Sequence, residues 1–363
     1  MSNNKFKVLD LFCGAGGLSR GFIDAGFEVV LGVDFDNNAL DTFKLNHDGA
    51  KTLSLDLFNT NNIYVITDFL KENNHKIDVL IGGPPCQGFS LAGPREEDDE
   101  RNRLYKEMVR LASIIKPKVV LIENVPGLLR LYEGKAAKRI YEDFENLGYK
   151  MQSKILYAPE YGIPQIRKRV FFVATLDNIV FDYPEPIITD PKKYITCEEA
   201  IGDLPSREND IGKEKDIYTK KPETKYQEYI RDGSDILYNH LGTNHIDKTK
   251  KLIAMIPEGK NYKSLPEEYR EQFKYNEALT RYHSKKPSLT INTGHRSHFH
   301  YKYNRVPSVR ESARLQSFKD TFVFTGPKTQ QYKLVGNAVP PLLGYYLAKE
   351  IKKSLEGHVD EKE

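Results

Sequence analysis

The stretch that decides the fold is Leu9-Asp-Leu-Phe-Cys-Gly-Ala-Gly-Gly-Leu-Ser19, in which an apolar strand, expected from Lys7 to Phe12, runs into a glycine-rich turn. Glycines at positions 14, 16 and 17 allow the backbone to approach a ligand closely. A helix that begins after such a turn presents its N-terminus to a carboxylate or phosphate group. Tight strand-to-helix turns also use glycine for steric reasons alone, so this stretch by itself predicts only a strand, a turn and a helix.

The same rhythm of strand and helix continues through the first half of the chain. Short apolar runs alternate with amphipathic patterns typical of helices, for example at Leu104 to Ile115 and at Ala136 to Leu147. The expected strands are Lys7 to Phe12, Val29 to Val33, Thr52 to Asp56, Asp78 to Gly82, Val119 to Glu123 and Arg169 to Ala174. This alternation predicts an α/β fold with a doubly wound, mostly parallel sheet.

The character of the chain changes at about Phe181, where prolines and charged residues interrupt the periodicity. Helical patterns return after Val306, at Ser308 to Gln316 and at Pro341 to Lys353. We therefore expect one domain built from residues 1–180 and 306–363, and a smaller irregular domain from residues 181–305. The charged tail after Leu355 has a composition typical of disorder.

Composition limits the class of protein. The chain has 363 residues, of which 39% are hydrophobic, enough for a substantial core. It has no apolar run of membrane-spanning length and no signal segment after Met1, which predicts a cytoplasmic protein without a membrane partner. Its three cysteines cannot form a disulfide framework and lack zinc-site spacing. A net charge of +3 permits an anionic partner without requiring one.

Two further strands are expected to end in carboxylates. Asp34 follows the glycine turn by about twenty residues, where comparable folds bind a ribose hydroxyl, and Asp56 ends the next strand. A nicotinamide cofactor would suit this layout, but the spacing Gly14-x-Gly16-Gly17 lacks the third glycine of the dinucleotide fingerprint. A nucleoside with a short charged tail fits better.

A lone thiol and an acid are expected at the same edge of the sheet. The run from Gly82 to Ser90 places Cys86 on a turn after a buried strand and two prolines, and Glu123 ends the next strand. An isolated cysteine of this kind is usually structural, and an isolated strand-end glutamate is usually exposed or salt-bridged. Side by side, they become candidates for a nucleophile and for an acid whose pKa is raised by burial.

Six motifs now stand in one order along the chain. They are Asp10-Leu-Phe-Cys-Gly-Ala-Gly-Gly17, Pro84-Pro-Cys-Gln87, Glu123-Asn-Val125, Gln165-Ile-Arg-Lys-Arg169, Arg310-Glu-Ser-Ala-Arg-Leu-Gln-Ser-Phe318 and Gly336-Asn-Ala-Val339. In content and order this set resembles the C5-cytosine DNA methyltransferases of bacterial restriction-modification systems. The resemblance covers nearly the whole catalytic framework and implies the S-adenosylmethionine-dependent methyltransferase fold with a smaller target-recognition domain at residues 181–305.

The resemblance also implies a reaction and its catalytic residues. The thiolate of Cys86 would add to C6 of a cytosine flipped out of duplex DNA, while Glu123 assists at N3. Arg169 would contact O2 of the base and Gln165 would order the site. Arg167 and Arg169 would help to stabilise the thiolate, although two such arginines can also be a surface salt-bridging pair.

For the cofactor, the resemblance implies S-adenosylmethionine, with S-adenosylhomocysteine as product. Phe12 and Phe35 would flank it, Asp34 would bind the ribose and Asp56 the adenine amine. The other expected contacts are Gly14, Gly16, Gly17, Leu57, Pro84, Leu104, Asn337 and Val339. The chain departs from the family pattern in having Asp34 where glutamate is frequent and Lys319 where proline is frequent.

For DNA, the resemblance implies a closing lid and a recognition surface. The polar loop of residues 90–103 is the expected lid, with Ser90, Arg95 and Arg101 as DNA contacts. The recognition domain has two stretches that interleave basic and aromatic groups, His283-Ser-Lys-Lys286 and residues 295–305, and its expected DNA contacts are Arg296, His298 and Arg305. No cysteine or acid lies in register with the histidines of residues 295–305, so no metal is expected. The enzyme would act as a monomer beside a separate cognate restriction endonuclease.

Two other functions fit part of the pattern. One branch of the same family methylates cytosine in tRNA with matching catalytic motifs, although the long recognition segment here favours DNA. The chain could also be a catalytically silent binding protein on the same fold. The intact set of Cys86, Glu123, Gln165 and Arg169 argues against that reading.

Overall fold

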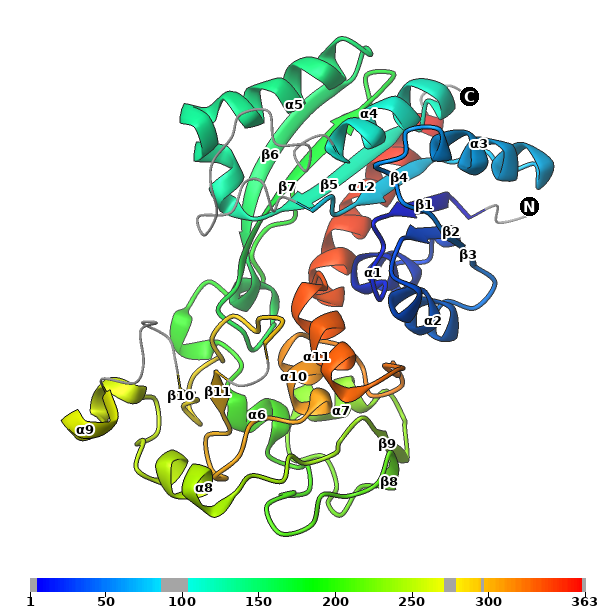
Figure 1. Cartoon of the computed structure of the whole chain (residues 1–363). Helices are drawn as coiled ribbons and strands as arrows, with labels where there is room; N and C mark the ends of the chain where they lie inside the picture. Colours follow the sequence, from blue (N-terminus) through cyan, green and yellow to red (C-terminus); the bar gives the residue numbers. More distant parts are fainter. Residues whose placement is uncertain (1–4, 86–103, 271–278, 295–296, 361–363) are drawn as a thin grey trace. The chain divides into compact units, whose positions relative to one another are not determined.

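The computed structural model describes residues 5–85, 104–270, 279–294 and 297–360 of the chain, with side chains up to His358. It divides into two compact units. The first unit consists of residues 1–157, 168–185 and 341–363, and the second of residues 158–167 and 186–340. Figure 1 shows both units, and each is described here by itself.

A seven-stranded sheet in the order β3-β2-β1-β4-β5-β7-β6 forms the centre of the first unit (Figure 1). The first five strands pair in parallel, whereas β7 runs antiparallel to both of its neighbours. The strands are β1 (Lys7–Leu11), β2 (Glu28–Asp34), β3 (Lys51–Ser54), β4 (Val79–Gly82), β5 (Val119–Asn124), β6 (Lys150–Tyr157) and β7 (Lys168–Thr175). The expected doubly wound, mostly parallel sheet is confirmed.

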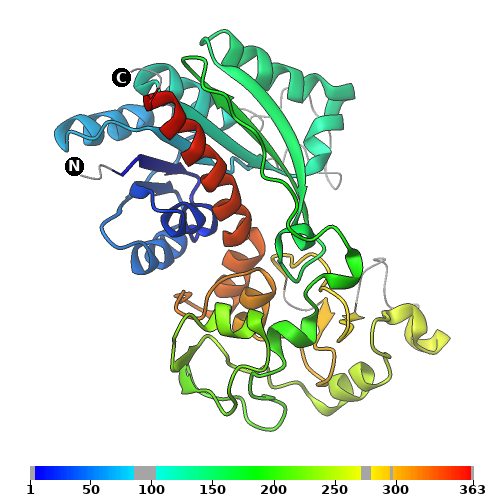
Figure 2. The same cartoon turned by 180° about the vertical axis from the view of Figure 1, so that it is seen from behind.

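Helices cover both faces of this sheet (Figures 1 and 2). The apolar sides of α3, α4 and α5 share one buried cluster with the strands. On the other face α12 packs along α1, and a side chain at Gly21 or Gly344 would overlap the backbone of the facing helix. The helices are α1 (Gly17–Asp24), α2 (Asn37–Asn46), α3 (Asn62–Glu72), α4 (Leu104–Ile115), the 3-10 helix η3 (Pro126–Gly134), α5 (Lys135–Glu145) and α12 (Pro341–Asp360).

The first unit differs from the expected elements in two places. Strand β6 was not expected, because it is an edge strand whose alternate residues, among them Lys150, Gln152 and Lys154, give no apolar run. The tail after Leu355 does not begin as a disordered segment, since α12 continues to Asp360. Leu355 is fully buried, so packing extends the helix beyond the point where composition becomes polar.

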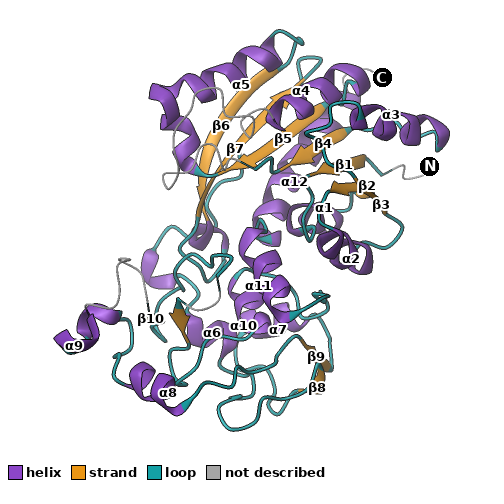
Figure 3. Ribbon diagram, in the orientation of Figure 1, coloured by secondary structure: helices purple, strands orange, loops and turns teal. Residues whose placement is uncertain are grey.

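The second unit has short elements joined by long irregular segments (Figure 3). Two small sheets occur in it: β8 pairs with β9 antiparallel, and β10 pairs with β11 in parallel. Its elements are η4 (Ala158–Tyr161), η5 (Pro191–Lys193), α6 (Cys197–Ile201), β8 (Lys215–Ile217), α7 (Lys225–Arg231), β9 (Ile236–Tyr238), α8 (Asp247–Ala254), η6 (Tyr262–Ser264), α9 (Glu267–Arg270), β10 (Thr280–Arg281), β11 (His298–Phe299), α10 (Val309–Leu315) and α11 (Lys328–Asn337).

The boundary between the units differs from the expected one. Residues 306–340 pack with residues 186–305 rather than with the sheet, and the chain returns to the first unit only at Pro341. The reason is a set of buried charges on α10. Arg314 lies 2.6 Å from a carboxylate oxygen of Asp203 and 2.6 Å from one of Asp320, and all three side chains are fully buried. Buried charges need such partners, and these partners lie in the second unit.

Among the described residues, no helix is long and apolar enough to cross a membrane. In the same part of the chain no three His, Cys, Asp or Glu side chains gather in a way that could hold a metal ion.

Candidate active site

The loop after β1 has backbone conformations that explain its glycines. Gly14 and Gly16 have φ of 53° and 86°, in the left-handed region that glycine tolerates best. A Cβ atom at Gly16 would overlap the ring of His47, which is itself stacked on Phe43 with 3.9 Å between the ring centroids. A Cβ at Gly14 would meet no atom within 4 Å. Gly16 is therefore required by packing, whereas Gly14 faces open space.

Asp34 ties this loop to the end of β2. Its carboxylate accepts hydrogen bonds from the backbone N–H of Gly14 at 2.9 Å and of Asp36 at 3.0 Å. Burial raises the pKa of the Asp34 carboxyl, and these hydrogen bonds act in the opposite direction. The next residue, Phe35, keeps 70% of its surface exposed. A large apolar ring left in solvent beside an open glycine loop provides a surface for a ligand.

Four more of the residues expected around the cofactor also lie in the first unit. Asp56 is exposed and accepts a hydrogen bond from the backbone N–H of Phe58 at 2.9 Å. Leu57, Pro84 and Leu104 are buried. Asn337 and Val339 belong to the second unit, where Asn337 is exposed and Val339 is buried.

The structure adds Asp10, a residue that sequence reasoning missed. It lies on β1 between β2 and β4 and is 2% exposed. Its Oδ2 atom is buried without a hydrogen-bond partner among the described residues. Burial raises the pKa of this carboxyl to about 8. An aspartate in the middle of an otherwise apolar strand was the available signal, because such a residue is costly to bury without a reason.

Glu123 and Arg169 form an ion pair across two neighbouring strands. Arg169 Nε lies 2.9 Å from Glu123 Oε1, and the two side chains are 16% and 13% exposed. The start of the loop that leads to Cys86 is held against this pair. The side-chain amide of Asn124 donates to the Pro84 carbonyl at 3.2 Å, and a Cβ at Gly83 would lie 3.2 Å from Glu123 Oε2.

Five of the expected site residues lie outside the described residues. They are Cys86, Ser90, Arg95, Arg101 and Arg296.

Gln165 and Arg167 lie in the second unit and are buried, at 0% and 1% exposure. The Arg167 guanidinium donates to the backbone carbonyls of Ile291, Gly336 and Ala338 at 3.0–3.2 Å. The expectation that Arg167 is catalytic is corrected: its donors hold the backbone on both sides of Asn337.

Gln165 and the previously overlooked Gln316 complete this cluster. The Gln165 side chain donates to Gln316 Oε1 at 2.7 Å and accepts from the Ile291 N–H at 3.0 Å. Gln316 in turn donates to the Ala338 carbonyl at 2.8 Å. Three of the sequence motifs thus meet in one buried network, a relation that their separation along the chain concealed.

Two expected DNA contacts are also corrected. Arg305 is 2% exposed and binds both carboxylate oxygens of buried Glu311 at 2.7 Å. His298 is 7% exposed, and burial lowers its pKa to about 4. Both side chains pack inside the second unit, where Arg305 is paired with Glu311 and His298 with the Tyr282 hydroxyl.

The fold and the site together define a class. A glycine-rich loop after β1, a carboxylate at the end of β2 and an antiparallel β7 beside β5 describe an α/β methyltransferase. The family model for C-5 cytosine-specific DNA methylases matches residues 6–353. The chain therefore belongs to the family of C-5 cytosine-specific DNA methylases, and it is a DNA methyltransferase of the restriction-modification type.

Similar proteins support this assignment across the whole chain. The Type II methyltransferase M1.HphI of Haemophilus parahaemolyticus is 38% identical over 350 residues, which cover 95% of this chain and 86% of that protein. M.DdeI of Desulfomicrobium norvegicum is 36% identical and covers 95% of this chain and 88% of its own length.

Solved structures agree. A DNA modification methyltransferase encoded within an Escherichia coli prophage matches with a TM-score of 0.80 and 28% identity, over 97% of this chain and all of that one. The Dnmt2 methyltransferase of Schizosaccharomyces pombe shares the fold, with a TM-score of 0.60 and 16% identity over 98% of this chain and 99% of that one.

Proposed function

We propose that this enzyme transfers a methyl group from S-adenosylmethionine to C5 of a cytosine in a specific duplex DNA sequence, through a covalent adduct between Cys86 and C6. The observation that supports this most directly is the Glu123–Arg169 pair, to which the Asn124–Pro84 hydrogen bond brings the loop that precedes Cys86. Pro84 stands two residues before Cys86 in the sequence.

The chemistry requires these groups together. Cytosine C5 is a weak nucleophile, and addition of a thiolate at C6 converts the ring to an enamine that is reactive at C5. Glu123 would stabilise charge at N3 by donating a proton or a hydrogen bond. Arg169 would bind O2, which is attached to the ring carbon next to N3. Two groups 2.9 Å apart are suited to N3 and the exocyclic O2, which are both bonded to C2. After methyl transfer, loss of the C5 proton would expel Cys86.

The residues of the first unit fit S-adenosylmethionine, which supplies an electrophilic methyl group when bound. The open side of Gly14 and the exposed ring of Phe35 leave room beside Asp34, the expected partner of the ribose hydroxyls. Phe12, Gly16, Gly17, Asp56, Leu57, Pro84 and Leu104 would complete the pocket from this unit. Asp10 Oδ2, which has no hydrogen-bond partner among the described residues, lies on the strand that leads into this loop, and a cationic ligand nearby would favour the ionised form of this carboxyl over the neutral form that burial favours.

We further propose that the target base is flipped out of the duplex, since its C5 and C6 atoms are otherwise enclosed by stacking. Residues 90–103 would close over it, with Ser90, Arg95 and Arg101 as DNA contacts. The second unit, corrected at its boundary to residues 158–167 and 186–340, would read the target sequence. The enzyme would act as a monomer and protect DNA from a separate endonuclease.

Bisulfite sequencing of DNA from a host that expresses the protein tests the reaction and gives its target site at once. We expect full protection of cytosine at one short sequence in the wild type and none in a Cys86→Ala host. Methyl transfer to tRNA but not to duplex DNA would replace this proposal with the RNA alternative. Unchanged methylation by Cys86→Ala would overturn the mechanism.

The covalent step has its own test. In a duplex whose target cytosine carries fluorine at C5, no proton is available for the final elimination, so the adduct should persist. We expect a denaturation-resistant protein–DNA complex with the wild type in the presence of S-adenosylmethionine and none with Cys86→Ala. Methylation of normal DNA without any trapped complex would contradict the adduct.

A further inference from the structure

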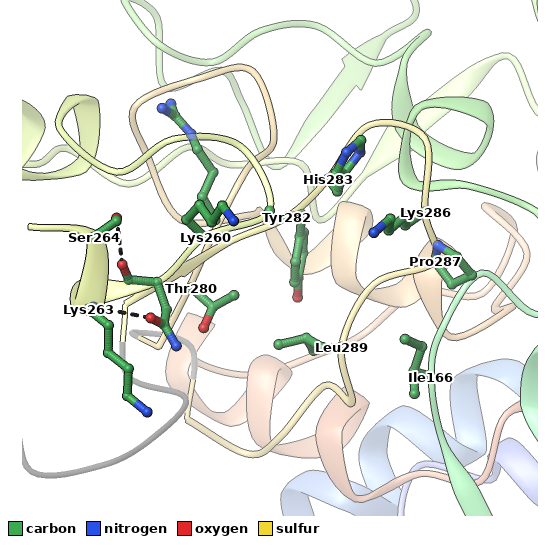
Figure 4. Close-up of a pocket in the computed structure, with 13 residues that line it drawn as sticks. Ile166, Lys260, Lys263, Ser264, Thr280, Tyr282, His283, Lys286, Pro287 and Leu289 are labelled. Atoms are coloured by element: carbon green, nitrogen blue, oxygen red, sulfur yellow. Dashed lines mark hydrogen bonds between the residues drawn. The ribbon is translucent and has the colours of Figure 1, made fainter.

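A cavity of about 610 Å³ lies within the second unit, beside strand β10 and the Tyr282 side chain, which contacts His298. Three segments of the chain line it: residues 259–264, residues 280–289 and Ile166 (Figure 4). Its polar and charged lining consists of Lys260, Asn261, Lys263, Ser264, Thr280, Arg281, Tyr282, His283 and Lys286. Among the described residues that line it there is no aspartate or glutamate, although the chain as a whole has nearly as many acids as bases.

The charges available to a ligand come from the lysines. The Arg281 guanidinium is buried and donates to the carbonyls of His300 and Ile256 and to Asn304, so it belongs to the scaffold. Lys260 and Lys286 are exposed and lie on either side of the Tyr282 ring in Figure 4.

Two carboxylates close to the cavity have described partners. Glu258 accepts a hydrogen bond from the Ser284 backbone and lies 3.4 Å from His283 Nδ1. Glu198 contacts Lys285, whose side chain is not among those that line the cavity. Among the described residues, the ion pairs of these two acids are made with His283 and Lys285 rather than with Lys260 or Lys286.

The walls of the cavity are joined by backbone hydrogen bonds and are formed before any ligand arrives. Gly259 N–H donates to the Arg281 carbonyl at 3.1 Å, and Arg281 N–H donates to the Lys260 carbonyl at 2.9 Å. A Cβ at Gly259, whose φ is +72°, would lie 2.9 Å from the His283 ring. Such preorganisation lowers the entropy cost of binding.

The cavity is also connected to the segment of the Gln165-Ile-Arg-Lys-Arg169 motif. Ile166 N–H donates to the Ser288 carbonyl at 2.7 Å, and the Thr290 hydroxyl donates to the Ile166 carbonyl at 2.6 Å. Ile166 itself lines the cavity and precedes Arg169 by three residues in the sequence. A ligand in the cavity therefore contacts the segment that leads to the proposed catalytic arginine.

We propose that this cavity is a docking site for the phosphate backbone of duplex DNA, with Lys260 and Lys286 as its phosphate contacts. The inference rests on the proposed action on duplex DNA and names the residues that hold the substrate. Lysine ammonium groups bind phosphate as point charges, and such contacts fix register without reading sequence. Arg305 and His298, which are buried, do not take this role.

The test is the salt dependence of DNA binding by the full chain. The double variant Lys260→Gln/Lys286→Gln loses two phosphate contacts, so the slope of log Kd against log salt should fall by about 2. Affinity at low salt should drop at least tenfold and by the same factor for target and non-target duplexes. Fluorescence anisotropy with a labelled duplex measures both quantities.

A charge-matched control is available in the same unit. Lys213 and Lys215 are exposed beside β8, away from β10 and β11 in both views of the fold (Figures 1 and 2). The double variant Lys213→Gln/Lys215→Gln makes the same change in net charge and should keep the wild-type slope. Thermal melting of both variants should match the wild type, because all four side chains are exposed.

Three results would overturn the inference. They are an unchanged slope in the Lys260/Lys286 variant, an equal fall in both double variants, and a fall seen with structured RNA but not with duplex DNA. Binding is measured here without methyl transfer. Failure of the docking site is thus distinguishable from failure of the proposed reaction, which bisulfite sequencing of the wild type reports.

Discussion

At the scale of single residues, the proposed reaction depends most on the pair formed by Glu123 and Arg169. Each side chain is nearly buried, and each has the other as an ionic partner at 2.9 Å. Without substrate the two charges balance, and a base placed against them would compete for both. Pairing lowers the cost of burying each charge, and in the proposed reaction the same two groups would bind the polar edge of the cytosine ring.

Replacement of Glu123 by glutamine tests its role. Glu123→Gln keeps the shape of the side chain but removes the acid, so kcat should fall by a factor of about 10²–10⁴, as for loss of a general acid. Binding of S-adenosylmethionine, measured by calorimetry, should change little. Glu185→Gln is the control, because Glu185 also faces a cation, Lys154 at 3.8 Å, but is 87% exposed. An active Glu123→Gln enzyme would contradict the assignment.

The contacts of Arg167 indicate that it holds the backbone around Asn337 in position. Substitution by lysine, which keeps the charge, tests this role. Lysine cannot reproduce the planar fork that holds the carbonyls of Ile291, Gly336 and Ala338. Arg167→Lys leaves buried acceptors unsatisfied, so we expect a loss of about 2–4 kcal/mol in the free energy of unfolding.

Urea denaturation measures that loss for Arg167→Lys. The same substitution at exposed Arg270 should change stability by less than about 0.5 kcal/mol. Wild-type stability with reduced kcat in Arg167→Lys would instead indicate a direct catalytic role.

At the scale of elements, the loop between β1 and α1 shows that similar glycines have different functions. Both Gly14 and Gly16 have positive φ, but only Gly16 is packed against a side chain. His47 is held there by Ser19, whose hydroxyl lies 3.1 Å from Nε2, and by the Phe43 carbonyl at 2.8 Å from Nδ1. The loop therefore rests on a rigid platform behind it and is open where Gly14 lies.

Alanine substitutions should separate these two glycines. Gly14→Ala should cost about 1–2 kcal/mol of stability, from the left-handed backbone alone. Gly16→Ala adds an overlap with the fixed His47 ring, so it should cost clearly more, and the double variant Gly16→Ala/His47→Ala should recover part of the loss. Chemical denaturation of the three variants measures this order. Equal effects at both glycines would contradict it.

At the scale of the whole molecule, the two units bury titratable groups of different kinds. In the second unit burial lowers the pKa of His240 and His298 to about 4 and that of His300 to about 3. In the first unit burial lowers the pKa of His47 to about 4 and raises that of Asp10 to about 8. These two shifts have opposite effects on how stability changes with pH. The units should therefore respond differently to acid.

The direction in which stability changes with pH follows from the number of protons that the folded and unfolded states bind. Below pH 6.5 these histidines are protonated in the unfolded state, whereas in the folded state they stay neutral down to about pH 4. The second unit therefore loses stability as the pH falls from 6.5 to 4. Each histidine contributes about 1.4 kcal/mol per pH unit. In the first unit a neutral Asp10 carboxyl stabilises the folded state as pH falls from 8, which offsets His47.

Hydrogen exchange between pH 7 and pH 5, corrected for intrinsic rates, should show earlier opening of the second unit. His298→Asn should reduce the pH dependence of that unit by about 1.4 kcal/mol per pH unit, because one titrating group is removed. Equal opening of both units, or an unchanged pH dependence of the second unit in His298→Asn, would contradict this prediction.

The sequence by itself determined the parallel part of the sheet, the glycine loop and the motifs at strand ends. These features depend on local patterns: apolar runs produce β1 to β5, and the carboxyl ends of parallel strands meet at one edge, which brought Glu123 to the loop that precedes Cys86. The alternating surface of β6 gave no such pattern.

Tertiary structure alone decided which charged residues face inward. The sequence predicted Arg167 to be catalytic and Arg305 to contact DNA, and it contained Arg314 only as part of a motif. Each of the three is buried, because carbonyls or carboxylates from other parts of the second unit pair with it. The same long-range pairing keeps residues 306–340 in the second unit and leaves Lys260 and Lys286 as exposed cations beside the cavity. A local pattern cannot specify this choice, since the cost of burying a charge depends on partners far away in the chain.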